Sequence, residues 1–205
     1  MSGTLKGTHE TGFTLIELLV AMVIAAIVMT SVYSVYYSQQ KSYIVQEQVA
    51  AMHQNLRAAM TIMEREIRMA GCNPKGNPSS GAGMITADSD VIRFKEDYRG
   101  QNPGDEPDGF ANVTQEEDIS YYLLNGSLVR DTSPGVSHTS EEIEDMVIAE
   151  NISSLNFTYW QGDGVSAATG LDDIRFVQII VTATNEDGSK TETLQTRIHA
   201  RNLGI

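Results

Sequence analysis

Three residues near the start of the chain have types and a spacing that indicate a functional site. Gly12 and Phe13 open an apolar run that extends to Tyr37, and Glu17 is the only charged residue within that run. The run is longer than the roughly 20 residues that cross a bilayer. A carboxylate in the hydrocarbon core of a membrane is costly, so an acid at such a place is by default a functional-site hypothesis that requires a partner.

The segment GFTLIELLVAMVIAA resembles the start of a type IV prepilin. In that family a short polar leader ends in Gly, a dedicated prepilin peptidase cuts after it, the next residue is N-methylated, and the fifth mature residue is Glu. Gly12, Phe13 and Glu17 match these positions one by one. The resemblance implies a leader over residues 1–12 and a new amine on Phe13 as the partner of Glu17. The leader departs from the family in being less basic, with Lys6 set against Glu10.

Two other kinds of N-terminal segment share parts of this pattern. A secretory signal has an apolar stretch of about 7–15 residues before a small-x-small cleavage site, whereas here a longer run ends at Tyr33, Tyr36 and Tyr37 without such a site. An uncleaved signal anchor explains the length of the run and its interfacial tyrosines. It gives no reason for Gly12 before Phe13, or for Glu17. The pattern therefore favours the processed prepilin.

The acidic balance of the chain is unevenly distributed. Residues 1–70 hold five Lys or Arg and five Asp or Glu, so the net charge of −13 falls on residues 71–205, with nine basic and 22 acidic residues. Phosphate backbones are bound by clustered Lys and Arg, so we expect no nucleic-acid partner. Solubility is the simplest reason for the excess of acids.

No catalytic, metal or cofactor motif emerges, and we expect no enzymatic activity. Cys72 is the only cysteine and the four histidines are scattered, so zinc spacing is absent and no intramolecular disulfide can form. A lone cysteine is most often buried and inert. The paired carboxylates Asp172-Asp173 and Glu116-Glu117-Asp118 are expected to be solvated surface. Asp163, Asp172 and Asp173 lie in Gly-rich loops whose oxygens could hold calcium, but no EF-hand spacing is present.

The helix is predicted to continue from 13 to 70. The segment 38–70 contains no Gly or Pro and is rich in good helix formers. Its apolar residues recur every three or four positions and form one stripe, which we expect to pack against the protein's own head, with the methionines as core filler. The stripe consists of Val45, Val49, Met52, Leu56, Met60, Met63, Ile67 and Ala70. Gly71 is the predicted C-cap.

Beyond a loop over NPKGNPSSGAG, the periodicity becomes that of strands. Strands are predicted at 90–95, 117–124, 127–130, 146–149, 152–160, 174–184 and 190–200. Asn125-Gly126 is a strong hairpin signal, and a second hairpin is predicted across 185–188. The expected fold is α+β, a long N-terminal helix on a mainly antiparallel β-sheet head. The domains are the leader (1–12), the membrane-spanning and assembly half of the helix (13–37), its amphipathic half (38–70) and a periplasmic head (71–205).

The rest of the chain resembles the PilW family of type IV minor pilins. The likeness rests on RMAG at 68–71, IAENI at 148–152, FTYW at 157–160, GDG at 162–164 and RNL at 201–203. It implies a minor pilin in the inner membrane that helps to initiate, assemble or cap a pilus at the cell surface. Its implied partners are other minor pilins and the major pilin, bound through the N-terminal helix, together with the inner-membrane assembly platform. The J-type pseudopilins of type II secretion share this layout and are the first alternative. A signal-anchored periplasmic enzyme or binding protein is the second.

Overall fold

The computed structural model describes residues 12–100, 102, 104–185 and 187–203. Residues 1–11 of the predicted leader and Glu186 of the predicted hairpin lie outside this range. The described chain divides into two units at Glu47 and Gln48. Within it, α1 (Leu15–Met69) is the one helix long and apolar enough to cross a membrane, judged by length and composition.

The long helix ends where the sequence predicts. Gly71 adopts the left-handed conformation with φ of +79°, and its N–H donates to the carbonyl of Lys95 at 3.0 Å. A Cβ at this position would lie 2.9 Å from Leu203 Cδ2 and 3.0 Å from the carbonyl oxygen of Asn202. Glycine is thus required here both by the backbone turn and by the chain segment that passes over it.

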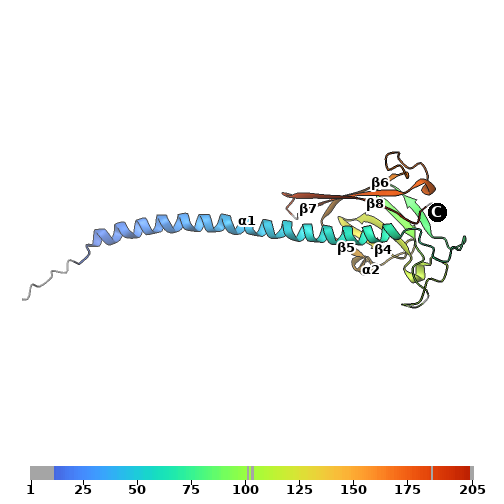
Figure 1. Ribbon diagram of the computed structural model, residues 1–205. Coiled ribbons are helices and arrows are strands. Elements are labelled where there is room, and N and C mark those ends of the chain that lie inside the picture. The colour runs from blue at the N-terminus through green and yellow to red at the C-terminus, as the bar shows by residue number, and fades with distance from the viewer. Residues whose placement is uncertain (1–11, 101, 103, 186, 204–205) are drawn as a thin grey trace, which may run out of the picture. The chain divides into compact units, whose positions relative to one another are not determined.

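The strands form two antiparallel sheets rather than the single sheet that we expected. The first has the order β1-β2-β3-β4-β5 and the second the order β6-β7-β8 (Figure 1). The strands are β1 (Gly83–Ala87), β2 (Val91–Lys95), β3 (Asp118–Leu124), β4 (Ser127–Asp131), β5 (Val147–Ala149), β6 (Ile152–Trp160), β7 (Phe176–Thr184) and β8 (Thr191–His199). The chain leaves the first sheet at Asn151, whose φ of 60° breaks the extended run between β5 and β6.

The seven predicted strands are present, each with ends close to those predicted. Asn125 and Gly126 both have positive φ, at 51° and 81°, as a two-residue hairpin between β3 and β4 requires. The strand β1 was missed, because its five residues begin within the Gly-rich stretch taken as a loop. The helix α2 (Ser140–Asp145) and the short 3₁₀ turns Val113–Gln115 and Leu171–Asp173 were missed as well.

The core of the head lies between the two sheets, around α1 from Gln48 onwards (Figure 1). The predicted stripe supplies its helical side, and Met63, Ile67 and Ala70 are fully buried. The sheets contribute Ile92, Phe94, Ile119, Tyr121, Leu128, Phe157, Val177, Ile179, Val181 and Ile198. The expectation that the methionines of the stripe serve as core filler is confirmed for Met52, Met60 and Met63.

Candidate functional site

Glu17 and Thr14 form a capping box at the first turn of α1. The Glu17 carboxylate accepts from the Thr14 backbone N–H and from the Thr14 hydroxyl, both at 2.8 Å, while the Glu17 N–H donates to Thr14 Oγ1 at 3.4 Å. Such a reciprocal pair satisfies backbone donors that a helix start leaves without partners. The capping-box signal is present in the sequence as Thr-x-x-Glu. It was missed because only the charge of Glu17 was considered.

The two carboxylate oxygens of Glu17 differ in their hydrogen bonds. Both bonds from Thr14 end on Oε2, and Oε1 accepts no hydrogen bond from any residue that the structure describes. In the uncleaved chain the nitrogen of Phe13 belongs to the peptide bond with Gly12. The carboxylate therefore holds the start of the helix through one oxygen, while the other has no hydrogen bond within the described residues.

Gly12 has no structural need to be glycine. A Cβ at this position would meet no atom of the described residues within 4 Å. Phe13 is 90% exposed. The described fold therefore gives no reason for this pair of residues, in contrast to Gly71, where backbone and packing both demand glycine.

The apolar half of α1 presents its side chains outward. Within the described chain, none of the window that could cross a membrane is buried. The two hydroxyls inside this region bond to their own helix: Thr30 donates to the Ala26 carbonyl at 2.8 Å and Ser31 to the Ile27 carbonyl at 3.0 Å. Because these polar groups are satisfied internally, the surface suits a lipid environment or contact with another helix.

Sequence reasoning missed a buried polar group that joins α1 to the first sheet. Glu66 is 7% exposed and accepts from the Tyr121 hydroxyl. It also pairs with the Arg130 guanidinium, whose Nη2 lies 2.9 Å from Glu66 Oε1. Glu66 lies three residues after Met63 and four before Ala70 on the apolar stripe, so the helical spacing itself could have indicated its burial.

The expectation that Glu116-Glu117-Asp118 is solvated surface is wrong for two of its three residues. The Asp118 carboxylate is fully buried and pairs with Arg93 at 2.9 Å and Lys95 at 3.1 Å. Glu117, also fully buried, accepts from the backbone N–H groups of Tyr98, Arg99 and Asn112. These carboxylates organise the loops around the first sheet, so their role is structural.

Cys72 lies close to two further buried acids. Burial, together with the charges of Glu96 and Asp97, raises the pKa of its thiol, which disfavours the reactive thiolate. Cys72 is half-buried, less enclosed than expected for a lone cysteine. Burial, and secondly the charge of Glu66, raises the pKa of Glu96 to about 7.

The loop acids proposed for calcium hold their own turns. The Asp163 carboxylate accepts from the N–H groups of Val165 and Ser166 and from the Ser166 hydroxyl, and Asp173 accepts from the Thr169 hydroxyl at 2.8 Å. Asp172 and Asp173 are exposed, as predicted. Across the described residues, no group of three or more His, Cys, Asp or Glu is arranged to hold a metal ion.

The start of the chain matches a known family model. Residues 8–33 match the prokaryotic N-terminal methylation motif, a range that contains Gly12, Phe13 and Glu17. No curated protein matches the chain. The motif, the apolar helix behind it and the antiparallel β-sheets together have the architecture of a type IV pilin-like protein anchored in a membrane.

Proposed function

We propose that this chain is a minor pilin of the PilW type, which helps to initiate, assemble or cap a type IV pilus. Prepilin peptidase removes residues 1–12, Phe13 is methylated, and the apolar half of α1 holds the subunit in the inner membrane with its head in the periplasm. The observation that carries the proposal is the methylation motif at residues 8–33, which precedes an exposed apolar helix and a β-rich head. The subunit acts through binding and not through catalysis.

Glu17 links processing to assembly in this account. Cleavage after Gly12 creates a positive amine on Phe13, one helical turn from the carboxylate. Since Thr14 occupies only Oε2, Oε1 can receive that amine, or the amine of a neighbouring subunit, without disturbing the start of the helix. A charged pair in apolar surroundings is stabilising only while both members are present. The pair therefore favours subunits that are both cleaved and correctly placed.

The partners follow from the exposed surface of α1. Other minor pilins and the major pilin bind helix against helix along residues 13–37, and the inner-membrane platform handles the assembled subunits. The test is recovery of companion pilins with the full-length protein from membranes. Glu17→Gln keeps the capacity to cap the helix, because Gln serves in capping boxes, but it removes the charge. We expect Glu17→Gln to be processed and folded yet to lose its companions.

The matched control is Glu47→Gln, which makes the same change at an exposed position of α1 outside the apolar run. It should retain normal recovery of partners. Equal recovery with Glu17→Gln and with wild type would remove Glu17 from the assembly mechanism.

A pseudopilin of type II secretion is the alternative that fits the same motif and architecture. Deletion of the gene separates the two. Loss of surface pili with intact protein export supports the minor pilin, whereas loss of export with intact pili supports the pseudopilin.

A further inference from the structure

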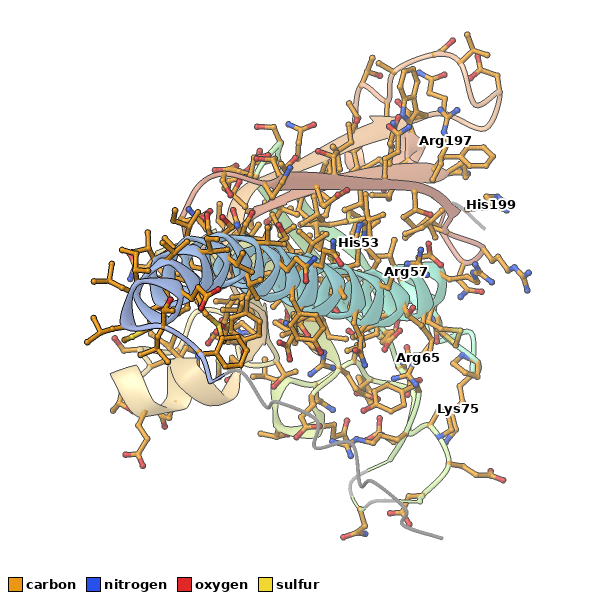
Figure 2. All side chains as sticks on the ribbon, turned by 90° about the vertical axis from the view of Figure 1, so that its left-hand side faces the viewer. His53, Arg57, Arg65, Lys75, Arg197 and His199 are labelled. Carbon is orange, nitrogen blue, oxygen red and sulfur yellow. The ribbon has the colours of Figure 1, made fainter. Side chains whose placement is uncertain are left out.

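Exposed arginines gather on one side of the head. Arg57, Arg65 and Arg68 lie on the solvent side of α1, Arg197 lies on β8, and Arg201 follows it; we call these five residues the basic face. The guanidinium groups of Arg57, Arg68 and Arg201 make no hydrogen bond or ion pair with any residue that the structure describes. Figure 2 shows the labelled Arg57 and Arg65 along the same side of α1, with Arg197 on the sheet above.

The basic face is continuous because β8 runs beside the last turns of α1. The Thr196 hydroxyl donates to Glu64 Oε1 at 2.6 Å, and the Asn202 side chain donates to the Met69 carbonyl at 3.4 Å. Further back along the helix, His53 Nε2 lies 3.3 Å from Glu192 Oε1. The two carboxylates at this border, Glu64 and Glu192, thus already have partners.

This face has the opposite sign to the rest of the head. Residues 48–205 contain 24 acidic and 12 basic residues. Exposed acids lie on the β1–β2 turn, on α2 and on the β6–β7 loop, which joins the sheet at Trp160 and Phe176 beside Arg197; they include Asp88, Asp90, Glu141, Glu142, Asp163, Asp172 and Asp173. Four other basic residues, Arg93, Lys95, Arg99 and Arg130, are used in ion pairs inside the head. The five arginines of the basic face therefore form a positive area on an otherwise acidic head, a feature that can select a partner by electrostatic complementarity.

The chemistry of the face suits a protein interface. Its cations are all arginines, the residue enriched at interfaces because its planar fork binds carboxylates with two hydrogen bonds. The Arg197 guanidinium is held over the rings of Trp160 at 4.6 Å and Phe176 at 5.5 Å, which limits the entropy that it loses on binding. Among the described strands, β8 pairs only with β7, in regular register, so its other edge carries no further strand and borders α1.

We propose that the basic face docks the acidic head surface of a neighbouring pilin-like subunit, an inference that rests on the function proposed above. A contact between a basic side and an acidic side is heterologous, and heterologous contacts that do not close generate helical filaments. The net charge of residues 48–205 disfavours nucleic acid as the ligand, because phosphates are repelled by the acidic remainder of the head. Such a contact would fix the positions of neighbouring heads relative to one another, in addition to the helix packing in the membrane.

The test is photo-crosslinking of the full-length protein in its own membranes. A benzophenone amino acid replaces Ala58, which is exposed next to Arg57, and a control probe replaces the exposed Thr158 on β6. With the native arginines, the Ala58 probe should give a crosslinked peptide that is net acidic and comes from the head of a second protein with a prepilin motif. Combined Arg57→Glu, Arg65→Glu and Arg68→Glu should lower the yield roughly tenfold or more, since like charges then face each other. Combined Arg→Lys changes at the same positions should retain most of it.

Three results would overturn the docking proposal: an unchanged yield after charge reversal, crosslinks to nucleic acid or lipid alone, or equal yields from the Ala58 and Thr158 probes. Processing at Gly12 and recovery of companion pilins are followed in the same samples. If companions are still recovered while the Ala58 crosslink is absent, only the docking proposal fails. If cleavage or companions are missing in the wild-type protein, the proposed function itself fails.

Discussion

We propose two tasks for the Glu17 carboxylate. One oxygen closes the first turn of α1 through Thr14, and the other is open to the amine that cleavage would create. A valine at this position would lose both tasks, whereas glutamine loses only the charge. For this reason the comparison of Glu17→Gln with Glu47→Gln isolates the electrostatic contribution to assembly.

The first prediction about a single residue concerns Gly12. The described fold leaves space for a side chain there, so Gly12→Val should fold normally but fail to fit a peptidase cleft. We expect the variant to accumulate as a precursor that is heavier by the mass of residues 1–12, as seen by intact-mass analysis. Gly170→Val, a change at an exposed glycine whose φ of −148° is extended backbone and whose nearest Cβ contact would be an ordinary 3.9 Å, should be processed fully. Cleavage of Gly12→Val at the wild-type rate would argue against recognition of this glycine.

A second prediction concerns Glu96 and the pH dependence of the stability of the head. Burial raises its pKa from the ordinary 4.5 to about 7, so the folded protein binds more protons than the unfolded chain between those values. The contribution of Glu96 to the free energy of unfolding therefore falls as pH rises from about 4.5 to about 7, and it is flat above that range. Glu96→Gln should remove this slope and stabilise the head by up to about 3 kcal/mol at pH 8, with little effect at pH 4.5. Thermal unfolding at several pH values measures it, and identical melting of both proteins at pH 8 would contradict the assignment.

Among the secondary-structure elements, the amphipathic part of α1 was the best predicted from the sequence. Its three-and-four spacing identified the stripe that packs into the head, since burial of an apolar face is what that period encodes. Asn125-Gly126 likewise identified the β3–β4 hairpin. The short helix α2 was missed although Thr139 and Glu142 form a capping box, with the Thr139 N–H 2.7 Å from Glu142 Oε2. A six-residue helix has too few turns to show a period.

The buried acids were not predictable from composition. Glu117 and Asp118 were expected to be solvated surface, and the burial of Glu66 was not predicted, but each is held by arginine, lysine or backbone donors that are distant in sequence. Such pairings depend on how the strands align and leave no local signal. The methylation motif is the opposite case, because all its parts lie within one short segment.

The docking of α1 into the head is tested by Leu56→Asp. Leu56 is 1% exposed, so the change places an unpaired charge in the core and should cost several kcal/mol. A fragment that starts near Ser38 should be soluble and monomeric, and it provides the sample for thermal unfolding. Arg57→Asp, at the next and exposed position, is the control and should melt close to wild type. An unchanged melting temperature for Leu56→Asp would show that the stripe faces a partner instead.

The buried pair of Glu66 and Arg130 gives a second test at this scale. Removing one member strands the other, so Arg130→Met should destabilise the head by about 3–5 kcal/mol. The double variant Glu66→Leu with Arg130→Met leaves no buried charge there and should recover much of that loss. Denaturant unfolding of wild type, Arg130→Met, Glu66→Leu and the double variant measures the coupling. Additive losses in the double variant would show that the two side chains act independently.

At the scale of the whole molecule, the chain joins an apolar segment that carries a methylation motif to an acidic, β-rich head. Motif, apolar helix and antiparallel sheets together support a type IV pilin-like protein, and its transfer from the membrane to an assembly is our proposal. The sequence allowed this architecture to be predicted, because its processing signal and its helical period are local. The division into two sheets and the basic face arise from distant strands and became visible only in the folded head.

The most direct measurement is the N-terminal sequence and intact mass of the native protein recovered from membranes. The account predicts a chain that lacks residues 1–12, begins at Phe13 and carries one methyl group on that nitrogen. A mature protein that begins at Met1 or Ser2 would contradict it, since the chain would then be an uncleaved signal anchor without the amine that Glu17 is proposed to meet.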